Sequence, residues 1–198
     1  MMTETDTKKA NKEKKDFDET FINSLSSISK GDLAVLKRNA GLSISESRGV
    51  FQIFYRIYPY SGQPGDNIYN EEIYYLVATL FGHNQNPIKK GSDFGTTMKY
   101  VNKTKKSSGI DKKMSALLDS SFEYGRSDGD LPYRLTQLVK LANSCNVGVD
   151  WICLLKDLKR WSHPNRFVQR NWAKSYFTNY EKQDQRNEKE TETPVMQE

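Results

Sequence analysis

The segment 150–177 constrains the fold more than any other part of the chain, because it holds all three tryptophans at helical spacing. With 3.6 residues per turn, its apolar side chains share one helix face and its basic side chains the other. The pattern breaks at 162–164 and then resumes, and Pro164 suits the first turn of a new helix. We expect two short-linked helices that pack by their tryptophan faces and present Arg166 and Arg170 outward. A core with a solvated basic face explains this pair by itself.

Elsewhere the apolar residues also recur at helical spacing, and no stretch alternates with the period of a strand. Gly31 is expected to end the first helix, Asp32 to cap the second, and Ser43 with Glu46 to open the third as a capping box. We predict an all-α protein, a compact bundle of eight or nine helices that forms one unit or two packed helical subdomains. The further helices are predicted over 17–29, 32–40, 43–58, 70–81, 110–118 and 131–142, with a short amphipathic piece at 94–101.

Both ends of the chain lack periodicity and are predicted to be disordered tails, 1–16 and an acidic 181–198. The helical domain is predicted over 17–180, with N-terminal helices at 17–82, a basic loop segment at 84–113 and a C-terminal bundle at 110–180. Of the net charge of +5, the tails contribute +1 and −3, so the body carries +7. A folded body with this charge favours a polyanionic partner such as nucleic acid or a phospholipid surface.

The segment from Lys89 to Lys113 is the strongest local electrostatic feature, with eight lysines and only two acids. We interpret it as a flexible segment of net charge +6. Blocks of like charge are often only solvated loops, so this feature alone does not separate a polyanion site from a loop.

The sequence offers little for catalysis. Its two histidines are far apart and match no metal motif, and no phosphate-binding glycine loop or nucleophile elbow occurs. Cys145 and Cys153 are too few for a disulfide framework and are expected to be buried thiols. No apolar run approaches the roughly 20 residues of a membrane span, and the N-terminus lacks the apolar centre of a signal peptide. We expect a cytoplasmic protein that is not an enzyme and uses no metal or cofactor.

Several local patterns, taken in order, resemble the CasB family, the small subunit of the type I-E CRISPR surveillance complex Cascade. The resemblance runs from about Phe17 to Phe177. Its clearest parts are GDLAVLKR at 31–38, FYR at 54–56, FGTTMKYV at 94–101, KKMSALL at 112–118, YRLTQLVKL at 133–141, VDWICLLKDLKRW at 149–161 and the WA pair at 172–173.

The resemblance implies an all-helical, non-catalytic subunit that assembles with the backbone and large Cascade subunits and with a second copy of itself. It further implies a basic groove that holds the DNA strands opened by the CRISPR RNA, without contact to a membrane. Two positions depart from the family's pattern: Thr136 stands where a second arginine is common, and Asp93 to Gly95 replaces an SLG turn.

The resemblance also implies where DNA is bound. Basic residues of the family's pattern coincide with Lys37, Arg38, Arg56, Lys99, Lys112, Lys113 and Arg134. To these we add Lys89 and Lys90 from the basic segment and Arg126 from the turn before 130. Arg38, Lys99 and Arg134 are the preferred candidates for phosphate contact, although Arg134 can instead pair with Asp130.

A displaced strand exposes phosphates in no fixed base sequence, and cations on a rigid scaffold bind it by counterion release. The predicted function is therefore to bind the DNA backbone without sequence specificity and to stabilise the R-loop during RNA-guided target recognition in antiviral defence. The alternative is a structural adaptor whose basic surfaces meet acidic protein partners without direct DNA contact. A nuclease is a third possibility, and its strand cleavage would depend on a specific carboxylate and a divalent metal.

Overall fold

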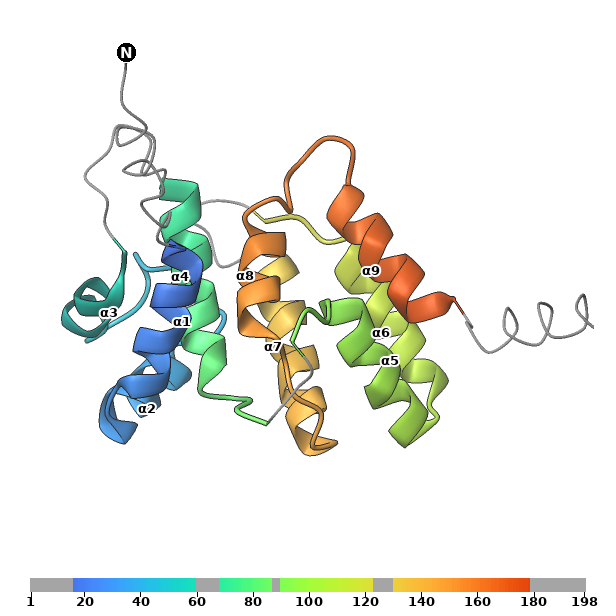
Figure 1. The fold of residues 1–198 in the computed structure, drawn as a ribbon, viewed down its shortest axis with the longest axis horizontal. Coiled ribbons are helices and arrows are strands. Elements are labelled where there is room, and N and C mark those ends of the chain that lie inside the picture. The colour runs from blue at the N-terminus through green and yellow to red at the C-terminus, as the bar shows by residue number, and fades with distance from the viewer. Residues whose placement is uncertain (1–15, 60–67, 87–89, 123–129, 179–198) are drawn as a thin grey trace, which may run out of the picture.

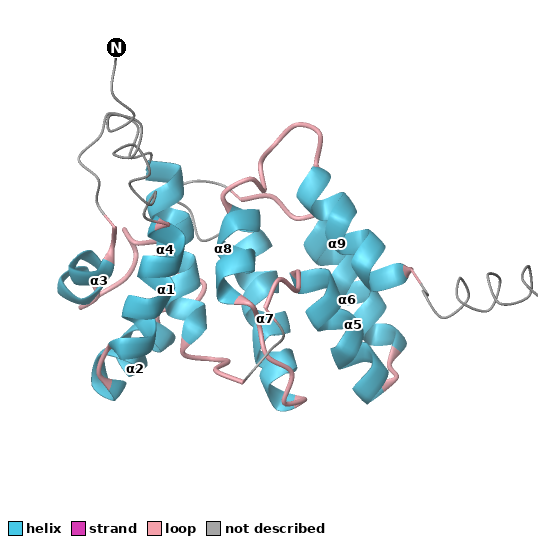
Figure 2. Cartoon of the chain, in the orientation of Figure 1, coloured by secondary structure: helices cyan, strands magenta, loops and turns pink. Residues whose placement is uncertain are grey.

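The computed structural model describes residues 16–59, 68–86, 90–122 and 130–178, and within these ranges it contains nine α-helices and no strand (Figures 1 and 2). The all-α prediction with eight or nine helices is confirmed. One hydrophobic cluster of the described residues draws side chains from all nine helices. The helices are α1 Phe17–Ser27, α2 Lys30–Arg38, α3 Phe51–Ile57, α4 Ile68–Phe81, α5 Phe94–Lys105, α6 Ser108–Leu118, α7 Asp130–Ser144, α8 Trp151–Leu158 and α9 Phe167–Phe177.

The helices form two groups on either side of α7 and α8. In Figure 1, α1 to α4 lie on one side and α5, α6 and α9 on the other. Every residue of α4 from Glu72 to Phe81 is buried. A helix that is buried on all sides belongs to the interior of a bundle, and α4 accordingly packs against α2, α7 and α8.

Trp161, which follows α8, packs against Trp172 of α9, but the two helices of 150–177 do not pack mainly on each other as predicted: α8 packs against α1 and α4, and α9 packs against α5. The Trp161 and Trp172 ring centroids are 5.0 Å apart, and Phe94 of α5 lies 5.3 Å from Trp172. A Cβ atom added to Gly95 would lie 2.2 Å from the carbonyl oxygen of Trp172, so only glycine allows α5 to approach α9 this closely. Arg166 and Arg170 are both exposed, as predicted, and Arg166 also donates hydrogen bonds to the Leu118 carbonyl and to Asp119.

Several predicted helix boundaries in the N-terminal part are wrong. Helix α2 begins at Lys30 under a Ser29 cap, so Gly31 lies inside it instead of ending α1. The Glu46 carboxylate accepts from the Ser43 backbone N–H, as in a capping box, and also from the Ser43 hydroxyl, but this contact belongs to short turns, and α3 begins only at Phe51. Local cap chemistry therefore occurs where the sequence places it, whereas packing decides which turn continues as a helix.

Asp16 corrects one tail boundary, because its carboxylate caps α1 and its backbone is part of the fold. The remainder of the predicted tails, 1–15 and 181–198, lies outside the described residues. Cys145 and Cys153 are half-buried rather than fully buried thiols, and burial raises the pKa of the Cys153 thiol to about 12.

The prediction of a basic loop at 84–113 is also wrong, because α5 and the first half of α6 occupy most of it. Phe94, Met98 and Val101 bury an apolar stripe. The Asp93 carboxylate caps α5 by accepting from the Thr96 backbone N–H at 2.8 Å. Lysine is a good helix former, so the high local charge does not oppose this helix once one face is buried.

Candidate nucleic-acid interface

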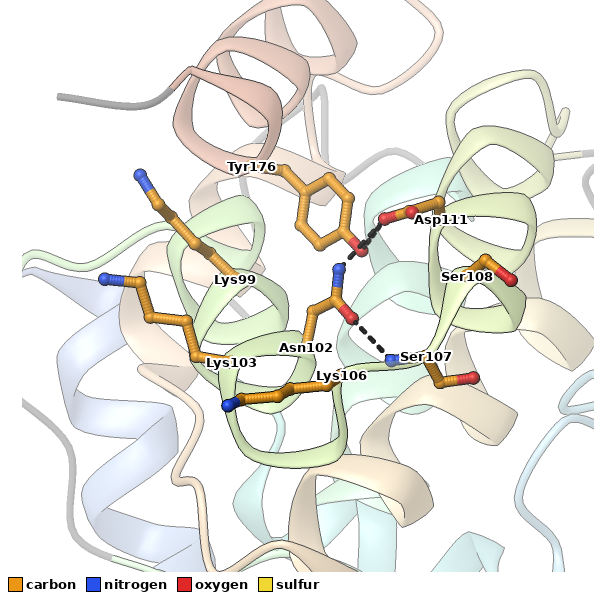
Figure 3. Close-up of a pocket in the computed structure, with 8 residues that line it drawn as sticks. All are labelled: Lys99, Asn102, Lys103, Lys106, Ser107, Ser108, Asp111 and Tyr176. Atoms are coloured by element: carbon orange, nitrogen blue, oxygen red, sulfur yellow. Dashed lines mark hydrogen bonds between the residues drawn. The ribbon is translucent and has the colours of Figure 1, made fainter. Parts of the chain in front are cut away.

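Two lysines of α5 and the lysine that follows the helix line one pocket, and we call Lys99, Lys103 and Lys106 the α5 lysine stripe. Lys99 and Lys103 are four residues apart on α5, whereas Lys106 is its C-cap residue in the left-handed conformation, and Figure 3 shows the three side chains extending to the same side of the pocket. The pocket has a volume of about 300 Å³ and lies between α5, α6 and α9. Lys99 was a predicted site residue, whereas Lys103 and Lys106 were not, because their segment was interpreted as a loop.

A hydrogen-bonded network shapes the wall of this pocket. The Asp111 carboxylate accepts from the Tyr176 hydroxyl at 2.7 Å and from the Asn102 side chain at 2.9 Å (Figure 3). Burial, and then the hydrogen bond to Asp111, raise the pKa of Tyr176, so its phenol stays protonated at neutral pH. The network ties α5, α6 and α9 together and occupies the one acidic side chain among the described residues that line the pocket.

Lys99 is only partly directed at solvent. Its side chain is half-buried, and its ammonium donates to the Thr178 carbonyl at 2.7 Å, just beyond the last turn of α9. A cation is favourable at the C-terminal end of a helix, where the macrodipole is negative. Lys99 therefore has a structural contact in addition to its place in the stripe.

Lys113 and Arg134 meet at a second pocket, of about 280 Å³, between α6 and α7. Arg134 also pairs with Asp130 at 3.1 Å, one turn earlier, as the sequence allowed. An exposed pair of this kind contributes about 0–1 kcal/mol, so the guanidinium can exchange partners at little cost. Lys112 is exposed beside Lys113 on α6.

Lys37 and Arg38 are exposed in the last turn of α2, where they gain a neighbour that the sequence did not reveal. The His83 ring contacts the Lys37 carbonyl oxygen at 3.2 Å. Burial lowers the pKa of His83, and the positive charges of Lys140 and Lys37 lower it further. Lys140 of α7 and Lys37 of α2 thus face the same imidazole, and the resulting basic cluster draws on both helices.

The remaining predicted site residues stand apart from these clusters. Arg56 lies on α3 and pairs with Asp32 of α2 at 2.7 Å, away from α5 to α7 (Figure 1). Lys90 is exposed in the loop before α5. Lys89 and Arg126 lie outside the described residues. Of the predicted cations, Lys37 and Arg38 therefore lie together on α2 and Lys113 and Arg134 lie together between α6 and α7, whereas Lys99 shares its pocket with two lysines that were not predicted.

Metal chemistry finds little support in the described ranges. They contain no group of three or more histidine, cysteine or acidic side chains placed to hold a metal ion. Burial raises the pKa of Asp157, but this carboxylate accepts a hydrogen bond from the Trp172 indole at 2.6 Å and serves the core. Among the helices described, each is too short or too polar to cross a membrane.

Comparison with protein families and sequences gives consistent matches. The family described as CRISPR-associated protein Cse2 matches residues 32–177. A CRISPR-associated protein Cse2 of Thermus thermophilus is 31% identical over 106 residues, which are 54% of this chain and 56% of that protein. The match thus spans little more than half the length of this relative.

Solved structures share the fold. CasB of M. ruber has a TM-score of 0.66 at 24% identity, covering 89% of this chain and 98% of the other. A Cse2-family protein of Thermus thermophilus has a TM-score of 0.65 at 24% identity, covering 81% and 97%. A chain of a CRISPR RNA-guided surveillance complex has a TM-score of 0.66 at 18% identity, covering 86% and 97%. At these identities the likeness establishes the helical architecture.

Proposed function

This chain belongs to the CRISPR-associated Cse2 family, and from that premise we propose that it is a non-catalytic small subunit of a type I-E CRISPR surveillance complex, Cascade. In this proposal it assembles with the backbone and large subunits and with a second copy of itself. Its cations hold DNA strands opened by the CRISPR RNA and stabilise the R-loop. The family match over 32–177, which includes α5 to α7 with their basic clusters, is the observation that carries the proposal.

The physical basis is electrostatic. Lysines and arginines on a rigid helical bundle release counterions from phosphates and bind a strand regardless of its bases. R-loop formation exchanges one duplex for another of similar stability, so a few contacts to the DNA backbone shift its balance. The α5 lysine stripe and the Lys113–Arg134 pair supply such contacts on neighbouring helices.

Charge reversal in the assembled complex tests this function. Arg38→Glu, Lys99→Glu and Arg134→Glu together are expected to shorten the R-loop lifetime by about tenfold or more, because attraction to three phosphates becomes repulsion. A matched control reverses three exposed cations outside the predicted sites, Lys30, Arg170 and Lys174. An unchanged lifetime in the first variant, with the complex intact, would reject the proposal.

One set of contacts favours the structural adaptor as a second candidate. Arg56, Arg134 and Lys99 each contact a protein carboxylate or carbonyl, so part of their charge already serves the fold. Titrating the isolated chain with single- and double-stranded DNA at two salt concentrations separates the candidates. DNA binding that weakens steeply with salt supports the strand-holding function, and weak, salt-insensitive binding supports the adaptor.

A further inference from the structure

The pocket between α6 and α7 differs in composition from the lysine-lined pocket on α5. Its lining consists of Lys113, Tyr133, Arg134, Gln137 and Leu138. Tyr133 is 64% exposed, the highest value among the large apolar and aromatic side chains in the described ranges. Leu138 is 1% exposed and forms the apolar floor. An aromatic ring thus stands at the mouth of a pocket flanked by two cations.

Helix geometry fixes this arrangement. Tyr133 and Gln137 are four residues apart, as are Arg134 and Leu138, so all four side chains lie on adjoining rows of one face of α7. Helix α6 packs against that helix and contributes Lys113 from the opposite wall. The ring therefore projects from a rigid helix rather than from a loop, and its position is set before any ligand arrives.

Phosphate binding alone does not require an exposed ring. In the α5 pocket the aromatic side chain is Tyr176, which is 6% exposed and donates its hydroxyl to Asp111. That pocket can attract a phosphate but offers no aromatic face for stacking. The α6–α7 pocket combines the two elements by which proteins hold single strands, a cationic surface for the backbone and an aromatic side chain for a base.

We propose that the α6–α7 pocket holds one unpaired base of a single strand, stacked on Tyr133, while Lys113 and Arg134 contact the flanking phosphates. Gln137 presents both a donor and an acceptor, so it can bond the edge of any base without selecting one. This inference rests on the proposed function and adds to it a preference for single strands, because the bases of a duplex are already stacked on one another.

The experiment titrates the full chain with labelled single strands of about twelve nucleotides and follows fluorescence anisotropy. One strand is oligothymidylate, and the other has the same backbone without bases. Tyr133→Ala is expected to weaken oligothymidylate binding by about 5- to 150-fold and to leave binding of the abasic strand unchanged. Tyr133→Phe keeps the ring and is expected to bind like the unaltered chain. Oligouridylate, titrated in parallel, shows whether DNA or RNA supplies the base.

Tyr100 provides a matched control, because it is 55% exposed on α5 and lines neither pocket. Thermal unfolding of each variant confirms that the fold is intact. Equal losses in Tyr100→Ala and Tyr133→Ala, or no loss in Tyr133→Ala while binding stays salt-dependent, would overturn the base pocket and leave the backbone contacts standing. Salt-insensitive, weak binding to both strands would overturn the proposed function together with this inference.

Discussion

The cations of the α1–α4–α8 region and those of the α5 lysine stripe are used in different ways. In the first region, the Lys159 ammonium lies 2.7 Å from the Asp18 carboxylate and 3.3 Å from the Tyr74 hydroxyl, at a contact between three helices. Burial and the Asp18 carboxylate raise the pKa of Tyr74, which stays protonated and donates to that carboxylate. Around the stripe, three lysines share a pocket with a single acid, Asp111.

The difference teaches how a chain of modest net charge can present a basic surface. The pairs Asp18–Lys159 and Asp16–Lys156 join the start of α1 to α8 and its C-terminal end. The α5 pocket contains three lysines and one acid, Asp111, which accepts from the Tyr176 phenol and the Asn102 amide. The local balance of charged residues therefore matters more for binding than the net charge of the whole chain.

The α5 lysine stripe keeps its position only if α5 stays packed against α9. Substitution of Gly95 is the most severe test of this packing. Gly95→Ala places a methyl group against the Trp172 backbone, which cannot move aside without separating the helices. We expect the free energy of unfolding to fall by about 3 kcal/mol or more, measured by urea denaturation. Gly31→Ala is the control, because its nearest neighbour is Ser29 Oγ at 3.8 Å and alanine favours the helix. Equal free energies of unfolding for the two variants would contradict the close approach of α5 to α9.

Removing the half-buried Lys159 cation tests the first region. Lys159→Ala leaves the Asp18 carboxylate, of which 10% is exposed, without its counter-charge, and we expect a loss of about 3 kcal/mol in the free energy of unfolding. Lys156→Ala removes an exposed cation from Asp16 and is expected to cost less than about 1 kcal/mol. Urea denaturation of both variants measures the difference. Similar losses of unfolding free energy would show that burial does not distinguish the Asp18–Lys159 pair from the Asp16–Lys156 pair.

Neutralising the α5 lysine stripe tests the second region. Replacing Lys99, Lys103 and Lys106 by glutamine removes three charges, and the salt slope for a single strand falls by about 0.7 for each phosphate that is no longer neutralised. We expect the slope to fall by about two units, equivalent to a roughly 16-fold smaller change in affinity between 50 and 200 mM salt. Anisotropy titrations at several salt concentrations measure it. Lys156→Gln serves as the control, and an unchanged slope in the triple variant would exclude the stripe from the binding surface.

The smallest expected effect concerns pH. The pKa of His83 is lowered in the folded chain by burial and by Lys140 and Lys37, so the unfolded chain takes up a proton more readily. Stability should therefore fall as the pH drops through the unfolded value of about 6.5. Urea midpoints measured between pH 7.5 and pH 5, at about half-unit steps, should decline less in His83→Gln than in the unaltered chain. Identical declines of the urea midpoint in both chains would show that burial and the two lysines do not lower the pKa of His83.

Several features of this protein follow from its sequence alone. Helical spacing predicts the tryptophan faces of α8 and α9, and short motifs in a fixed order resemble the family to which the chain belongs. The Arg134–Asp130 pair is also predictable, because it joins residues one turn apart on a helix. The same spacing argument applies to Lys99 and Lys103 of α5, but the high charge of their segment favoured the prediction of a loop.

Tertiary structure alone decided which charged residues from distant parts of the chain come together. Asp18 and Lys159 are 141 residues apart in the chain, and local spacing carries no information about such a pair. The same holds for Lys113 and Tyr133, which share a pocket only because α6 packs against α7. Periodicity assigns a side chain to a face of its own helix, whereas its partners depend on which helix covers that face, and packing of the whole core determines this.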